Sequence, residues 1–162
     1  MAFSIYTFSN SVNNLVNKNN TTTSGLDISS GLKKRIQKIT MGFHENKPNL
    51  NILYPAVWVE PKVKSSNFAK MGGNAYRSMT VDYQIIGIVQ TGLGVFDGRE
   101  ESDGEMLKLS ANLDTLLRNF IKLSQTSVTM SLVESTEYDV IESNDTYNSI
   151  CKLNLKVNIW SD

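Results

Sequence analysis

DGEMLKLSANLDTLLRNFIKL, residues 103–123, is the stretch of this chain whose pattern most clearly predicts an amphipathic helix. Its apolar residues recur at three- and four-residue steps, which places them on one side of a helix. They are Met106, Leu109, Leu113, Leu116, Leu117 and Phe120, and the opposite side carries Lys108, Asn112, Asp114 and Arg118. The segments before and after it are rich in strand-forming residues, so we expect the apolar stripe to cover a sheet.

Two signals mark the start of this helix. Ser102 and Glu105 have the spacing of a capping box, and Asp103 places negative charge at the positive end of the helix dipole. We therefore expect the helix to begin close to residue 103.

Length and composition favour one domain with a tail. A chain of 162 residues, 40% of them hydrophobic, is long enough for one core and too short for two domains. We place a partly irregular arm at residues 1–29 and a single α+β domain at residues 30–162. The formal net charge is zero, which excludes the global basic field that attracts nucleic acids without regard to sequence.

The sequence also bears on the compartment. The only cysteine, Cys151, cannot form an internal disulfide, which suits a reducing cytoplasm. No apolar run approaches the roughly 20 residues needed to span a bilayer, and the first residues lack the basic and apolar regions of a signal peptide. We expect a soluble protein that is not secreted.

The first 29 residues predict little regular structure. Residues 9–30 are dominated by Asn, Ser and Thr and contain too few apolar residues to bury a face without help. The aromatic residues before this segment, Phe3, Tyr6 and Phe8, are expected to anchor the arm either on this domain or on a neighbouring subunit.

A second helix is expected from Ser30 to about Met41. Leu32, Ile36 and Ile39 would line one side of it. Its other side would be basic, with Lys33, Lys34, Arg35 and Lys38.

Four strands follow from β-branched residues and alternation of apolar with polar residues. They are expected within residues 52–61, 76–90, 126–135 and 147–160. Residues 61–76, rich in Lys, Ser, Asn and Gly, predict a long loop or a loose hairpin tip. The order helix, strand, strand, helix, strand, strand is typical of an α+β two-layer sandwich with a mainly antiparallel sheet.

Individual strand residues carry further expectations. In the third strand Val128, Met130 and Leu132 should form the buried side, and residues 134–146 should form a polar connection. Ile86 and Ile88 occupy positions that ought to be polar, so we expect the first helix or another subunit to cover them.

Element lengths suggest an oligomer. A strand over residues 147–160 would extend about 46 Å at ~3.3 Å per residue, whereas the helix over 103–123 covers about 31 Å at ~1.5 Å per residue. An apolar strand face left uncovered is an aggregation hazard in a monomer. We therefore expect it to pack against another copy or another protein.

Catalytic and cofactor motifs are weak or absent. The loop GLGVFDG, residues 92–98, lies between a strand and a helix but lacks the glycine spacing of a dinucleotide fingerprint and the Gly-Lys-Ser/Thr of a P-loop. His44 has no partner for a zinc site, and Cys151 falls on an apolar strand face where an inert buried thiol is expected. We predict no enzyme activity, no catalytic residue, no cofactor and no metal.

An acidic cluster around the central helix start has two interpretations. A hard cation such as calcium could gather it, but a solvated first helical turn is the more common explanation. Its members are Asp97, Glu100, Glu101, Asp103 and Glu105.

Basic residues also have two interpretations. They could contact phosphates, or they could form an ordinary solvated face. The set comprises Lys33, Lys34, Arg35, Lys38, Lys62, Lys64 and Lys70. The final strand carries Lys152, Asn154, Lys156 and Asn158 where an RNA-binding sheet would carry stacking aromatics, which weakens a nucleic-acid function.

Trp58 and Trp160 are expected to be core or interface anchors. With Phe3, Tyr6, Phe8, Ile86 and Ile88 they form the candidate subunit or partner interface.

Five segments follow one another along the chain: the basic segment from residue 30, ILYPAVWVEP, YRSMTVDYQIIGIVQTG, GEMLKLSANLDTLLRNF and the closing CKLNLKVNIW. This succession resembles the tail terminator (tail completion, minor tail protein U-like) family of long-tailed bacteriophages. The resemblance spans residues 30–160 and rests on element order and size. Residues 1–29 have no counterpart in compact members of that family.

The resemblance implies a structural virion protein of the tail or neck, assembled in the host cytoplasm. It implies a homo-oligomeric ring, a hexamer, that caps the tail tube, terminates its growth and joins it to the head connector or head completion protein. DNA would pass through the lumen without being read, and no membrane would be involved. Two alternatives stay open: another phage neck or baseplate component, and a nucleic-acid-binding α+β module.

Overall fold

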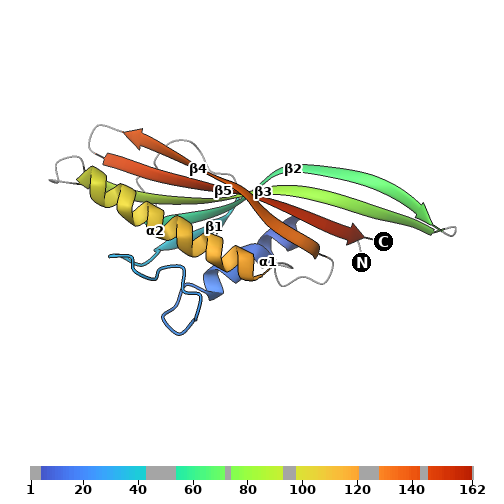
Figure 1. Ribbon diagram of the computed structural model, residues 1–162, viewed down its shortest axis with the longest axis horizontal. Coiled ribbons are helices and arrows are strands. Elements are labelled where there is room, and N and C mark those ends of the chain that lie inside the picture. Colours follow the sequence, from blue (N-terminus) through green and yellow to red (C-terminus); the bar gives the residue numbers. More distant parts are fainter. Residues whose placement is uncertain are drawn as a thin grey trace.

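The computed structural model describes residues 5–42, 54–71, 74–92, 98–120, 128–142 and 146–161. Side chains are described for the same residues except 63–79, 92, 129, 160 and 161. The elements follow the order α1, β1, β2, β3, α2, β4, β5 (Figure 1). The structure is α+β, as predicted, although the order of its elements differs from the expected one.

One five-stranded sheet organises the molecule. Its strand order is β1-β2-β3-β5-β4. The strands are β1 (Lys38–Met41), β2 (Ala56–Met71), β3 (Asn74–Gly92), β4 (Val128–Glu142) and β5 (Thr146–Ser161). The sheet is mixed, because β1 runs parallel to β2 while the other three pairs are antiparallel.

The central helix α2 (Gly98–Asn119) packs through the predicted apolar stripe. Met106, Leu109, Leu113, Leu116 and Leu117 are all buried in the main core against one face of the sheet. Phe120, just beyond the helix, is partly buried against the same core. The burial pattern confirms the predicted apolar side.

The predicted start of this helix is wrong by more than one turn. The helix begins at Gly98, so Ser102 and Glu105 lie inside it and form no capping box. Ser102 is buried, and its hydroxyl donates to the carbonyl oxygen of Val89 at 3.2 Å.

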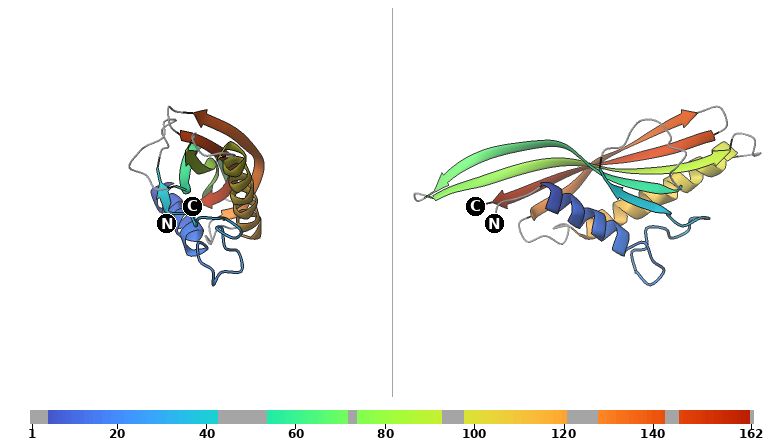
Figure 2. Two further views of the ribbon diagram at one scale, coloured as in Figure 1. Left: turned by 90° about the vertical axis from the view of Figure 1, so that its left-hand side faces the viewer. Right: turned by 180° about the vertical axis from the view of Figure 1, so that it is seen from behind.

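The helix α1 (Ile5–Lys18) occupies about half of the segment 1–29 that was expected to be a partly irregular arm. Phe8, Val12, Leu15 and Val16 are buried in the main core, and the ring of Phe8 lies 5.3 Å from that of Tyr83. Both helices lie on the same side of the sheet (Figure 2). α1 packs against β1 and β2, and the inward residues of β5 are buried within the single chain, so the length of β5 does not by itself indicate an oligomer.

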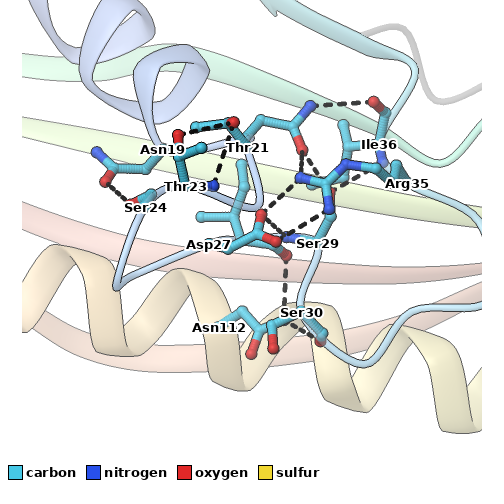
Figure 3. Close-up of polar contacts among 12 residues, drawn as sticks. Asn19, Thr21, Thr23, Ser24, Asp27, Ser29, Ser30, Arg35, Ile36 and Asn112 are labelled. Atoms are coloured by element: carbon cyan, nitrogen blue, oxygen red, sulfur yellow. Dashed lines mark hydrogen bonds and ion pairs between the residues drawn. The ribbon is translucent and has the colours of Figure 1, made fainter.

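The second helix expected from Ser30 to Met41 does not form. Residues 19–37 are an irregular segment that ends in β1. Arg35 donates two hydrogen bonds to the carboxylate of Asp27, at 2.9 and 2.7 Å (Figure 3). Asn112 of α2 donates to the carbonyl oxygens of Ile28, at 3.1 Å, and Ser30, at 2.8 Å. Side-chain bonds to the backbone replace the helical ladder here.

A long regular hairpin forms at residues 61–76, where a long loop or a loose hairpin tip was expected. β2 and β3 pair from Ala56 with Ile88 to Met71 with Asn74, interrupted by one irregularity between Pro61 and Val63. The far end of this hairpin projects beyond both helices (Figure 1). Hairpin pairing of the backbone therefore outweighs the loop-like composition of the segment.

The last two strands differ in how well alternation predicts them. On β5 the five predicted inward residues Cys151, Leu153, Leu155, Val157 and Ile159 are all buried. β4 is longer than expected and includes most of the predicted polar connection.

A register shift in β4 reverses part of its predicted burial. The shift lies between Val128 and Met130. Val128 remains buried, but Met130 and Leu132 are 46% and 48% exposed. An extra residue in one strand turns the following side chains to the other face, which overturns the assignment of Met130 and Leu132 to the core.

Gly87 in β3 allows α2 to approach the sheet closely. A Cβ atom there would lie 2.9 Å from Cδ2 of Leu109 and 3.0 Å from Sγ of Cys151. Gly87→Ala is expected to lower the free energy of unfolding by about 1–3 kcal/mol through overpacking. The measurement is urea denaturation.

Gly104→Ala is the matched control, because a Cβ atom at that helical position meets nothing within 4 Å. It should raise the free energy of unfolding by about 0.5–1 kcal/mol, since alanine favours a helix more than glycine does. Equal effects of the two substitutions would contradict close packing at Gly87.

Candidate functional site

The sheet face opposite the helices, here called the outer face, has an apolar end. Trp58, Ile86 and Ile88 cluster there with Ala56 and Ile150. The exposed fractions of Trp58, Ile86 and Ile88 are 6%, 2% and 3%. The sequence identified Trp58, Ile86 and Ile88 as interface candidates, but they are already buried within one chain.

The rest of the outer face carries polar side chains, a ladder of uncharged ones together with Asp82, Lys152 and Lys156. Hydrogen bonds between β3 and β5 join Thr80 to Asn158 at 3.2 Å and Gln84 to Asn154 at 2.9 Å. Asn154 also donates to Ser135 of β4 at 2.9 Å. Because these groups satisfy one another, the face offers a polar surface without a dominant charge.

Exposed apolar side chains concentrate on β4. Met130, Leu132, Tyr138 and Val140 are between 44% and 54% exposed. The register places Met130 and Leu132 on the outer face, whereas Tyr138 and Val140 lie on the helix-facing side, where Tyr138 bonds Ser110 of α2. Exposed apolar side chains are typical of interaction sites. Sequence reasoning missed this feature, because it required the register shift after Val128 and the strand to continue past Glu134.

Part of β2 and all of β4 lie at edges of the sheet, because each has a described strand on one side only. β1 pairs with β2 only over Ala56–Val59. The segment Pro61–Met71, here called the β2 edge, has no described strand beside it on that side. The strand Val128–Glu142 pairs with β5 on one side, and no described strand lies along its other side, here called the β4 edge. Such edges are templates for pairing with another chain.

The predicted basic residues do not form one face. Lys33 pairs with Glu101 at 3.0 Å and Arg35 with Asp27 at 2.7 Å. Lys34 is exposed in the irregular segment, and Lys38 is exposed at the start of β1. Lys62 pairs with Glu60 at 2.6 Å. Lys64 and Lys70 lie on the β2 edge, where side chains are not described.

The remaining interface candidates are also dispersed. Phe8 belongs to the core, whereas Tyr6 on the same helix is 70% exposed. Trp160 lies opposite Ser78 in the sheet register, and its side chain is outside the described part. Phe3 also lies outside the described residues.

A buried polar cluster fixes α2 to β5. Asp103 accepts hydrogen bonds from the hydroxyls of Tyr147, at 3.1 Å, and Ser149, at 2.6 Å. Ser149 also bonds Ser102 at 2.9 Å. Burial and the neighbouring Asp103 raise the pKa of Tyr147. These hydroxyls are occupied in holding the helix to the sheet, so we assign the cluster a structural role.

The predicted acidic cluster does not converge on one point. Glu101 pairs with Lys33, Asp103 faces Tyr147 and Ser149, and Glu105 accepts from the backbone N–H of Lys33 at 2.9 Å. No group of three or more potential metal ligands is found among the described residues. Asp97 lies outside them.

Of the three remaining sequence candidates, Cys151 lies within the described residues. Burial raises the pKa of the Cys151 thiol to about 12, and a thiol with so high a pKa is a poor nucleophile at neutral pH. His44 and the interior of the 92–98 loop lie outside the described residues.

One open hollow of about 570 Å³ lies beside the irregular segment and is lined in part by Asp27, Arg35 and Asn112. The groups shown in Figure 3 bond one another, so nothing in the hollow points to a ligand. Neither described helix is long and apolar enough to cross a membrane.

These observations define an α+β protein whose candidate functional surfaces are the edges and outer face of one sheet. The sequence matches no protein-family model and no curated protein.

Proposed function

We propose that this protein is a structural subunit that forms a ring on the end of a bacteriophage tail tube. The ring would terminate tube growth and join the tail to the head connector. The proposal rests on a long sheet that leaves two edges without a described neighbour. One of these, the β4 edge, carries exposed apolar side chains. A monomer with this surface is an incomplete assembly unit.

The placement of the two helices suits this function. Both helices occupy one side of the sheet, which leaves the outer face available to line a lumen. Its polar side chains Thr80, Gln84, Asn154 and Asn158 are uncharged, and both charge signs occur among their neighbours Asp82, Lys152 and Lys156, so DNA would pass without strong attraction. The dispersed basic residues, two of them engaged in ion pairs on the irregular segment, favour a conduit over a nucleic-acid-binding module.

The test is to inactivate the gene in the phage that encodes the chain and to image the tails by negative-stain electron microscopy. We expect tube growth without a length limit and heads that carry no tails. Expression of the intact protein from a plasmid should restore tails of uniform length.

Tails of normal length joined to heads would refute the proposal. Normal tubes without heads would instead favour another neck component. Steeply salt-dependent DNA binding by the purified protein would favour the nucleic-acid alternative.

A further inference from the structure

The two edges of the sheet differ in charge. The β2 edge contains three lysines, Lys62, Lys64 and Lys70, and no acidic residue. The β4 edge contains four acidic residues and no basic one: Glu134, Glu137, Asp139 and Glu142. The protein has zero formal net charge, so this separation is a property of its edges and not of its composition.

Ion pairs within the chain leave part of this charge available. Glu134 lies 3.8 Å from Lys156, and Glu142 lies 3.1 Å from Arg99. Glu137 and Asp139 form no ion pair with any described residue, and both are exposed. The middle of the β4 edge therefore carries two exposed carboxylates without an ion pair in the described part of the chain, and Lys152 lies opposite Glu137 in the register. On the β2 edge, Lys62 is paired with Glu60 at 2.6 Å.

Strand directions allow the two edges to pair between copies. Successive pairs β2–β3, β3–β5 and β5–β4 are all antiparallel, so β2 and β4 run in opposite directions. Consider two copies related by a rotation about an axis parallel to the strands. The β2 edge of one copy can then lie beside the β4 edge of the other, and the two strands are antiparallel. The same contact can repeat from copy to copy and close into a ring.

Charge selects this arrangement over the alternatives. A two-fold contact would place each edge against itself, β4 against β4 or β2 against β2. Like charges would then face each other, which is unfavourable across an interface. Only the pairing of β2 with β4 brings opposite charges together.

We propose that the β2 edge of one copy pairs with the β4 edge of the next copy, in a head-to-tail contact steered by lysines and carboxylates. The occupant of each edge is thus a second copy of this chain. The inference deepens the proposed ring and rests on it for closure, but the contact itself can be tested without a phage tail.

The experiment uses two charge-reversed variants of the full chain. The β2-reversed variant carries Lys62→Glu, Lys64→Glu and Lys70→Glu. The β4-reversed variant carries Glu134→Lys, Glu137→Lys and Asp139→Lys. Light scattering at the highest soluble concentration gives the mass of each, and circular dichroism with thermal unfolding checks that each is folded.

Each variant alone should associate at least about a hundredfold more weakly than the unmodified protein, because like charges now face each other. An equimolar mixture should regain assembly, since each reversed edge meets an opposite charge on the other variant. A chain that carries both sets of substitutions should also assemble by itself. Native mass spectrometry should find the two variants in equal numbers in the mixed assemblies.

Several results would overturn the inference. These are an unmodified protein that stays monomeric, a single variant that assembles normally, and folded variants whose mixture stays monomeric. The proposed function is decided separately by the phage tails. Variants that follow the expected pattern, with normal tails in the inactivated phage, would leave the contact intact and refute the function.

Discussion

Removal of residues 1–18 is expected to unfold the protein, because α1 supplies part of the main core. Phe8, Val12, Leu15 and Val16 are each at most 5% exposed. Burial of such side chains contributes about 1.5–3 kcal/mol each, so their joint loss is comparable with the roughly 5–15 kcal/mol that stabilises a typical domain. Circular dichroism and urea denaturation of the truncated chain would measure the effect.

A pair of point variants on the same helix separates packing from helix formation. Phe8→Ala should lower the free energy of unfolding by about 3–5 kcal/mol, because Phe8 packs against Tyr83 in the core. Tyr6→Ala should change it by no more than about 0.5 kcal/mol, because Tyr6 is 70% exposed.

A truncated chain that keeps a cooperative unfolding transition would show that α1 is a separable arm.

Val157→Asp is expected to prevent folding or to lower the free energy of unfolding by more than about 4 kcal/mol. Val157 is 0% exposed on the helix-facing side of β5. A carboxylate there would lose its hydration, and the core around it is apolar. Soluble yield and urea denaturation would report the change.

Leu132→Asp is the matched control, since it introduces the same charge in the same sheet at a position that is 48% exposed. It should change the free energy of unfolding by no more than about 0.5 kcal/mol. Comparable loss of stability in both variants would contradict the assigned faces of β4 and β5.

Periodicity predicted the elements whose apolar residues are both numerous and regularly spaced. The stripe from Met106 to Leu117 and the alternation from Cys151 to Ile159 are buried as expected. In α1 the spacing of Phe8, Val12 and Leu15 was also helical, but the many Asn and Ser residues between them concealed it.

The candidate site was less predictable from sequence. Trp58 was expected in the core or at an interface, and Ile86 and Ile88 under the first helix or another subunit; all three are buried within the single chain. The apolar surface of β4 depends on a register shift that alternation alone does not reveal. The charged residues of the β2 and β4 edges can be read from the sequence. Only the sheet order shows that these two segments lie at its edges.

The sequence by itself determined the α+β class, the apolar side of α2 and the inward face of β5, because side-chain spacing along one element decides which side can be buried. Tertiary structure alone decided that α1 completes the core, that residues 61–76 form a hairpin and that β2 and β4 bear the edges. Those outcomes depend on contacts between segments far apart in the chain, such as Phe8 with Tyr83, and local propensity carries no information about them.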